Sequence, residues 1–178
     1  NEWKEQNGWL DIKDWEAIKE VNKDTSGLWF FNSGPLAGAS QPHRHIQLLR
    51  RDPSELSCPR EKWILALNNL NYKNEKFSKN IILKKFSKSL NEENIHEIYK
   101  DLSYNLGLGD PRNDKKPKYP YNLIFTDRWM IIIKRKTDNL FGISINALGF
   151  AGYILVTEKS DIKYLRELGP EKLLEDFL

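Results

Sequence analysis

The feature that most restricts the fold of this chain is an alternating polar triplet, His43, His45 and Gln47, placed directly after a loop of small residues. In an extended chain, side chains two residues apart point to the same face, so the spacing predicts that all three project side by side. Residues 28–31 form a short, aromatic-rich apolar run before the loop, and residues 46–49 form another after it. The sequence therefore predicts a strand, a loop and a second strand that the histidines open.

Such a face has a clear chemical use. Neutral imidazole is a nucleophile near neutral pH, so one histidine held there can attack phosphorus. Backbone amides of the loop and the Gln47 side chain can donate to phosphate oxygens. The predicted phosphate cradle consists of Gly38, Ala39, Ser40 and Gln41, where small side chains permit close approach of the backbone.

Three simpler interpretations compete with this one. Two histidines at this spacing also make half of a zinc site, but Cys58 is the only cysteine and His96 the only other histidine. Because conventional zinc ligands are so few, we expect no metal ligands in this chain. The triplet could also be a strand edge whose histidines have no role, and a small-residue turn alone usually means only a turn.

Two sequence blocks favour the functional interpretation. The run FNSGPLAGASQPHRHIQ, residues 31–47, resembles the signature of diadenosine tetraphosphate (Ap4A) phosphorylases. These enzymes are also called ATP adenylyltransferases and belong to the histidine-triad superfamily. A second run, GISINALGFAG at residues 142–152, resembles the C-terminal signature of the same family. Two blocks in the right order identify the chain as a member of this family.

The resemblance implies a role for each residue of the triplet. His45 is expected to be the nucleophile and to form an adenylyl-histidine intermediate, with a backbone carbonyl holding its second ring nitrogen. His43 is expected to orient the site or to contact the leaving phosphates. Gln47 stands where hydrolase branches of the superfamily have a third histidine, and it completes the catalytic set. The implied substrate-binding residues are Asn32, Gly38, Ala39, Ser40, Gln41, Gln47, Asn146, Ala147 and Leu148.

The expected reaction is phosphorolysis of Ap4A by inorganic phosphate to ATP and ADP, with Mg²⁺ able to accompany the polyphosphate. One alternative is a hexose-1-phosphate uridylyltransferase, which shares the alternating triplet. Against that alternative, Arg44 stands where a proline is expected, and the chain has no cysteine pair for the zinc site of that enzyme. The other alternative is a noncatalytic nucleotide-binding protein. In the resembled family, strands with a phosphate-contacting lysine precede the first helix found here, so the resemblance implies that the N-terminal part is missing.

Composition sets the remaining expectations. With 178 residues and 39% hydrophobic residues, the chain can form one ordinary core, so we expect a single histidine-triad-like domain over residues 1–178. A lone cysteine excludes an internal disulfide and is typical of the cytoplasm. No apolar run approaches the roughly 18 residues of a membrane span. The net charge of +3 argues against nucleic acid as a partner. We expect a monomer.

Periodicity predicts the other elements. Strand hairpins beside separate helices indicate an α+β fold, with an antiparallel sheet and flanking helices. Residues 50–90 show no dominant period, and we interpret them as an insertion over the core. The predicted elements are helices over residues 11–23 and 91–106, strands over 121–125, 129–133 and 150–156, and a last helix from Ser160.

Overall fold

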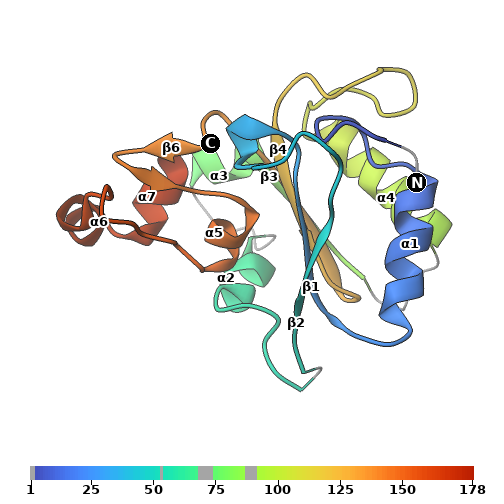
Figure 1. Cartoon of the computed structure of the whole chain (residues 1–178), viewed down its shortest axis with the longest axis horizontal. Helices are drawn as coiled ribbons and strands as arrows, with labels where there is room; N and C mark the ends of the chain where they lie inside the picture. Colours follow the sequence, from blue (N-terminus) through green and yellow to red (C-terminus); the bar gives the residue numbers. More distant parts are fainter. Residues whose placement is uncertain (1–2, 53, 68–73, 87–91) are drawn as a thin grey trace.

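The structure is a computed structural model that describes residues 3–52, 54–67, 74–86 and 92–178, and it has an α+β fold (Figure 1). Five strands form one antiparallel sheet in the order β2-β1-β4-β5-β3. The predicted fold class is confirmed. The strands are β1 Gly27–Asn32, β2 Gln47–Arg50, β3 Ile81–Lys85, β4 Tyr121–Phe125 and β5 Trp129–Lys134.

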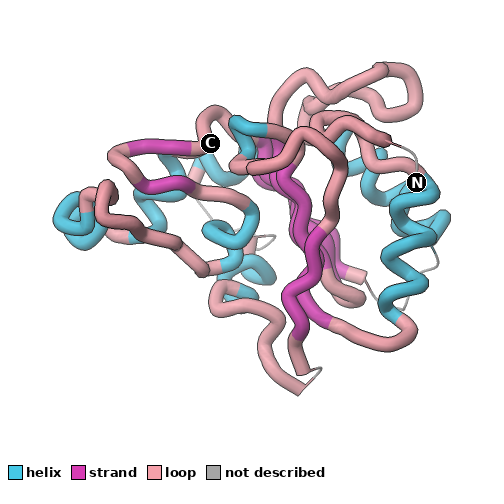
Figure 2. Tube along the Cα trace, viewed as in Figure 1, coloured by secondary structure: helices cyan, strands magenta, loops and turns pink. Residues whose placement is uncertain are grey.

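Helices cover both faces of the sheet (Figure 1). On one face lie α1 Ile12–Asn22 and α4 Glu92–Asn105, which pack against each other. The other face is covered by α2 Glu61–Ala66, α3 Glu75–Asn80, α5 Ala147–Ala151 and α7 Pro170–Asp176. Beyond this second layer lie the two-stranded pair β6 Asn139–Leu140 and β7 Ile143–Ser144, and α6 Ile162–Leu168. Figure 2 shows the loops that connect these elements.

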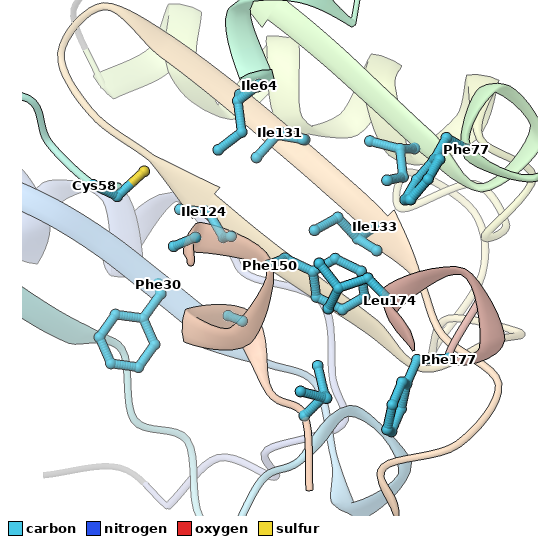
Figure 3. Close-up of a cluster of buried hydrophobic side chains, with 14 of the residues drawn as sticks. Phe30, Cys58, Ile64, Phe77, Ile124, Ile131, Ile133, Phe150, Leu174 and Phe177 are labelled. Carbon is cyan, nitrogen blue, oxygen red and sulfur yellow. The ribbon is translucent and has the colours of Figure 1, made fainter. Parts of the chain in front are cut away.

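The central strands are buried on both faces, which explains their continuous apolar sequences. In β1, Leu28 and Phe30 belong to one core, whereas Trp29 and Phe31 belong to the other. Figure 3 shows the first core, where Phe150 of α5 and Leu174 of α7 lie against the sheet. The alternation of strand side chains thus divides one sheet between two cores.

The first predicted helix is confirmed. α1 begins after Asp11, whose side chain accepts a hydrogen bond from the Lys13 N–H, while Asp14 accepts from the Asp11 N–H at 2.8 Å. This reciprocal pair is a capping box. Trp15 and Ile18 lie on the buried side of the helix, as their spacing predicts.

The hairpin and both later helices are also confirmed. β4 and β5 pair antiparallel, and Thr126 N–H donates to the Trp129 carbonyl at 2.9 Å across the connection. α4 ends before Gly107, which has a φ of +74°. The predicted cap of α4, Asn91, lies outside the described residues. α6 begins after Asp161, whose carboxylate accepts from the Tyr164 N–H at 2.8 Å.

The predicted strand over residues 150–156 is wrong. Residues 147–151 form helix α5, and residues 153–157 belong to no strand or helix. Asn146 begins the helix by accepting from the Leu148 N–H, and Gly152 ends it with a φ of +109°. A short apolar run does not distinguish a buried helix from a strand, and here the flanking cap residues decide.

Residues 50–90 contribute to the sheet and to its core. β3 forms an edge strand that pairs with β5, and Ile64 and Phe77 are buried on the face shown in Figure 3. β3 was not predicted, because its residues lie within a lysine-rich stretch that has no clear period. The status of the segment as an insertion stays a prediction.

Candidate active site

The histidine segment leads directly into β2, an edge strand of the sheet. β2 begins at Gln47, so the histidines precede the strand and do not open it as predicted. Instead, His43 forms an isolated antiparallel bridge with Glu5. The rings of His43 and His45 still lie side by side, with centroids 5.8 Å apart. The alternation therefore brings the two imidazoles together, although the backbone that holds them belongs to a loop.

The ring of His45 is anchored by the backbone. Its Nδ1 lies 3.1 Å from the carbonyl oxygen of His43. A carbonyl oxygen can only accept, so this contact requires the proton on Nδ1. In the neutral ring, the lone pair is then on Nε2. A histidine nucleophile needs this arrangement, in which a hydrogen bond to a backbone carbonyl fixes one ring nitrogen and leaves the other free to attack.

A buried glutamine, Gln6, fixes the backbone of the same segment. Its Oε1 accepts from the His45 N–H at 2.8 Å, and its Nε2 donates to the Asn32 carbonyl at 2.7 Å. Its own N–H donates to the Pro42 carbonyl at 2.9 Å. Gln6 thus joins the end of β1 to the histidine segment. Gln6 was not predicted from the sequence, because nothing in the local pattern marks a glutamine far from the histidines.

The predicted phosphate cradle divides into two parts. The N–H groups of Gly38 and Ala39 donate to the carbonyls of Pro35 and Gly34, within the 3-10 turn Pro35–Ala37. The backbone N–H groups of Ser40 and Gln41 donate to no acceptor among the residues that the structure describes. Only these last two N–H groups are available to an anion.

An open cleft of 540 Å³ adjoins this cradle. The loop from Ala39 to Pro42 forms one side of the cleft, and Trp3, Gln6 and Lys116 contribute to the other side. The Lys116 ammonium forms an ion pair with Glu5, which also lines the cleft. The site is therefore open to solvent beside the cradle and has room for a small anionic ligand.

The two signature blocks meet at this site. A side chain at Gly38, whose φ is +83°, would place a Cβ 2.7 Å from the Cβ of Asn146. In addition, Asn32 Oδ1 accepts from the Ala147 N–H at 2.9 Å. Residues separated by more than a hundred positions are thus in direct contact. Glycine is required at position 38 both by the backbone angle and by the close approach.

Several predicted substrate-binding residues make contacts within the protein. Asn32 is buried, with an exposed fraction of 3%, and its Oδ1 is engaged by Ala147. Asn146 caps α5 through its side chain, which occupies the Leu148 N–H. The N–H groups of Ala147 and Leu148 are therefore not free donors. Direct substrate contact by these residues stays a prediction, as does the catalytic role of Gln47, which is exposed at the start of β2.

Two buried polar residues beneath the site were not predicted. Asn122 lies directly opposite Asn32 in the β1–β4 register, and its Nδ2 donates to Asn32 Oδ1 at 2.7 Å and to the Ala37 carbonyl at 2.8 Å. Arg135 follows β5, and its Nη1 donates to Asn122 Oδ1. Burial lowers the pKa of the Arg135 guanidinium to about 9, so it stays charged at neutral pH. An asparagine within a fully buried strand was the available sequence signal.

The described part of the chain contains no group of three or more His, Cys, Asp and Glu residues that could hold a metal ion. Among the same residues, no helix is long and apolar enough to cross a membrane.

Comparison with known proteins shows two family matches. Residues 57–177 match the family described as the ATP adenylyltransferase C-terminal domain. Residues 1–65 match the family described as the Ap4A phosphorylase N-terminal domain. The sheet contains strands from both regions, since β1 and β2 lie in the first and β3, β4 and β5 in the second.

Two yeast proteins are similar in sequence. Diadenosine 5',5'''-P1,P4-tetraphosphate phosphorylase 2 of Saccharomyces cerevisiae is 24% identical over 155 residues, which is 79% of this chain and 48% of that protein. Protein APA1 of the same organism is 25% identical over 178 residues, covering 91% of this chain and 54% of that protein. The chain thus spans about half the length of the curated relatives it matches.

Solved structures of yeast Ap4A phosphorylase Apa2 share the fold. The complex with AMP matches with a TM-score of 0.70 at 22% identity and covers 99% of this chain and 65% of that one. The complex with Ap4A matches with a TM-score of 0.63 at 20% identity, again over 99% of this chain and 65% of that one. At this identity the likeness establishes the fold, an α+β arrangement with an antiparallel sheet, as expected from the sequence.

Proposed function

The chain belongs to the ATP adenylyltransferase family of Ap4A phosphorylases, and from this premise we propose that it cleaves Ap4A with inorganic phosphate to give ATP and ADP. The observation that carries the proposal is the contact between His45 Nδ1 and the His43 carbonyl. It leaves Nε2 of a neutral imidazole as the nucleophilic atom. The names of the yeast relatives that are Ap4A phosphorylases support the same reaction.

In the first step, Nε2 of His45 attacks the α-phosphorus of one adenosine, and the bond from that phosphorus to the bridging oxygen breaks. ATP leaves, and AMP stays bound to the ring. In the second step, an oxygen of inorganic phosphate attacks the same phosphorus, the P–N bond breaks, and ADP leaves. The adenylylated ring is cationic, and its Nδ1–H then donates a charge-assisted hydrogen bond to the His43 carbonyl.

The free N–H groups of Ser40 and Gln41 support charge stabilisation in both steps. Nonbridging oxygens of the reacting phosphate carry negative charge, and donors that are already oriented stabilise it without reorganisation. Gln47 supports transfer over hydrolysis. Its amide does not titrate near neutrality, so it can hold the intermediate without acting as a proton shuttle for water.

The proposal includes Mg²⁺ carried by the phosphate oxygens, since a polyphosphate with a divalent ion needs few protein ligands. It also includes a cytoplasmic monomer. Cys58 is compatible with a reducing compartment, because it is buried and burial raises the pKa of its thiol to about 11, which keeps it unreactive.

The decisive experiment incubates the whole protein that carries this chain with Ap4A and ¹⁸O-labelled phosphate, and identifies the products by mass spectrometry. We expect label in ADP, unlabelled ATP and little AMP. A parallel reaction without phosphate should stop after one turnover. Cleavage to AMP and ATP without phosphate would place the protein among hydrolases, and nucleotide binding without any product would make it a noncatalytic binder.

A further inference from the structure

A buried guanidinium lies beneath the predicted active site. Arg135 is buried, with an exposed fraction of only 2% for the whole residue. Its Nη2 donates to the carbonyls of Thr137 and Ile145 at 2.6 and 2.8 Å, and its Nη1 donates to Asn122. The Ile145 carbonyl belongs to the residue before Asn146. Arg135 therefore touches both the sheet and the segment that leads into α5.

All hydrogen-bond acceptors of Arg135 in the described part of the chain are neutral oxygens. Asp138 favours the charged form from a longer range. A buried cation without a carboxylate in direct contact is costly, since desolvation is not offset by an ion pair. The rings of Phe150 and Phe177, whose centroids lie 5.0 and 5.4 Å from the guanidinium carbon, provide cation–π contacts but no negative charge.

The contacts of Arg135 determine the orientation of two amides. A guanidinium has donors only, so Asn122 must present Oδ1 to Arg135 and Nδ2 to the other side. That Nδ2 donates to Asn32, which must therefore present its own Oδ1 inward. The assignment of amide oxygen and nitrogen, often ambiguous, follows here from the direction of donation.

The same orientation of Asn32 holds the second signature block. Because Asn32 Oδ1 points inward, it can accept from the Ala147 N–H at 2.9 Å. The relay thus runs from Arg135 through Asn122 and Asn32 to Ala147, and each member is fixed by the one before it. Hydrogen bonds in such a chain polarise one another, and a charge at one end strengthens the effect.

We propose that Arg135 is a positioning residue of the active site, which acts through Asn122 to hold Asn32 and the Ala147 backbone in the geometry that binds nucleotide. The inference rests on the proposed function, since it takes the site to bind an adenine nucleotide. Arg135 itself does not touch substrate. Its positive charge also favours a phosphate chain above the relay, because Coulomb interactions weaken little in a low-dielectric interior.

The test uses an isosteric change, Asn122→Asp, in the whole protein that carries this chain. The carboxylate still accepts from Arg135, so volume and one contact are retained. Its second oxygen, however, faces Asn32 Oδ1 and the Ala37 carbonyl, which are both acceptors. Asn32 must rotate its amide to donate, and the Ala147 N–H then loses its acceptor.

We expect two effects of Asn122→Asp. Amide hydrogen exchange of Ala147, followed by NMR, should become about tenfold faster, the size expected for loss of one hydrogen bond. The Kd for AMP, measured by calorimetry, should rise by about the same factor. Arg135→Lys, which keeps the charge but not the fork of donors, should lie between wild type and Arg135→Met in both measurements.

A matched control separates positioning from a general loss of stability. Glu61 is equally buried, with an exposed fraction of 2%, and its carboxylate accepts from Trp129 and Ser57 at 3.0 Å. Glu61→Gln is the reverse isosteric change at a site away from the relay. Glu61→Gln should lower the melting temperature. It should not change the affinity for AMP, nor the exchange rate of the Ala147 N–H relative to globally exchanging amides.

The outcomes decide the inference independently of turnover. Unchanged Ala147 exchange in Asn122→Asp, unchanged AMP affinity despite faster exchange, or equal effects from Glu61→Gln each overturn it. A wild-type protein that binds AMP but does not phosphorolyse Ap4A refutes the proposed function, whereas the exchange and affinity results still decide the role of Arg135.

Discussion

Arg44 Nη1 lies 2.8 Å from Asp14 Oδ2, and this ion pair anchors the histidine segment to α1. The two side chains have exposed fractions of 10% and 12%. Arg44 stands between the two histidines, and its backbone N–H donates to the Lys4 carbonyl at 2.8 Å. Because alternate side chains point apart, the pairing of Arg44 with α1 directs His43 and His45 to the opposite side. A Cβ at Gly8 would lie 2.6 Å from Arg44 Nη2, so the chain leaves room for the guanidinium.

Breaking this pair should destabilise the protein. Arg44→Met leaves the largely buried Asp14 carboxylate with only the longer contact to Lys4, whose Nζ lies 3.7 Å from Asp14 Oδ1. We expect a loss of about 2 kcal/mol, between the values for surface and buried pairs. Urea unfolding of Arg44→Met, Asp14→Asn and the double variant measures the coupling energy. Lys163→Met, which breaks an exposed pair with Glu167, is the control and should cost at most about 0.5 kcal/mol. Additive effects of the two single substitutions would contradict the anchoring role.

Gly38→Ala should weaken the junction of the two signature blocks. The alanine must adopt a φ of +83°, and its Cβ would overlap Asn146. Gly107→Ala is a matched control, because Gly107 has a similar φ of +74° but no atom within 4 Å of the added Cβ. The backbone strain alone costs about 1 kcal/mol, and we expect about 3 kcal/mol at position 38. Thermal unfolding gives both values, and equal losses would show that the close approach to Asn146 is unimportant.

The sequence predicted the elements whose signals are local. α1 has a capping box beside an apolar periodicity, and β4 and β5 are β-rich runs on either side of a short connection. The alternating triplet likewise indicated the pairing of the His43 and His45 rings. In each case, residues within a few positions of one another determine the outcome.

The remaining features depend on contacts between distant segments. Gln6 reaches His45 across 39 positions, and Asn32 reaches Ala147 across 115. In neither pair does the sequence around one residue indicate which distant residue it contacts. The predicted strand over residues 150–156 was wrong for a different reason. The cap residues Asn146 and Gly152, and not the hydrophobicity of the run, determine where helix α5 begins and ends.

Acid should destabilise the protein partly through His96, on α4. Burial lowers the pKa of this imidazole below its ordinary value of about 6.5, and the nearby Lys100 charge acts in the same direction. Above pH 6.5 the residue is neutral in both the folded and the unfolded state. As the pH falls below that value, the unfolded state binds the proton first, so stability decreases until the folded pKa is passed.

His96→Gln should therefore flatten the dependence of melting temperature on pH between about 7 and 5. Because the slopes of melting temperature against pH are compared, a change in stability that is the same at every pH does not affect the result. His43→Gln serves as the control, since His43 is exposed. An equally steep acid loss in His96→Gln and wild type would assign the effect to other groups.

The contact between His45 Nδ1 and the His43 carbonyl makes unequal predictions for the two histidines. His45→Ala removes the nucleophile, and we expect Ap4A phosphorolysis to fall by a factor on the order of 10⁴, because only binding and the phosphate donors remain. His43→Ala removes an exposed ring but keeps the backbone carbonyl that holds Nδ1. Its rate should therefore fall by only about 10- to 100-fold.

Peptide mass spectrometry after incubation with Ap4A without phosphate should find AMP on the His45 peptide, as an adduct that acid cleaves and base does not. Both variants should keep the wild-type melting temperature within a few degrees, since neither ring lies in the core. If His43→Ala is inactive and His45→Ala turns over normally, the nucleophile is His43, and the backbone contact at Nδ1 has another purpose.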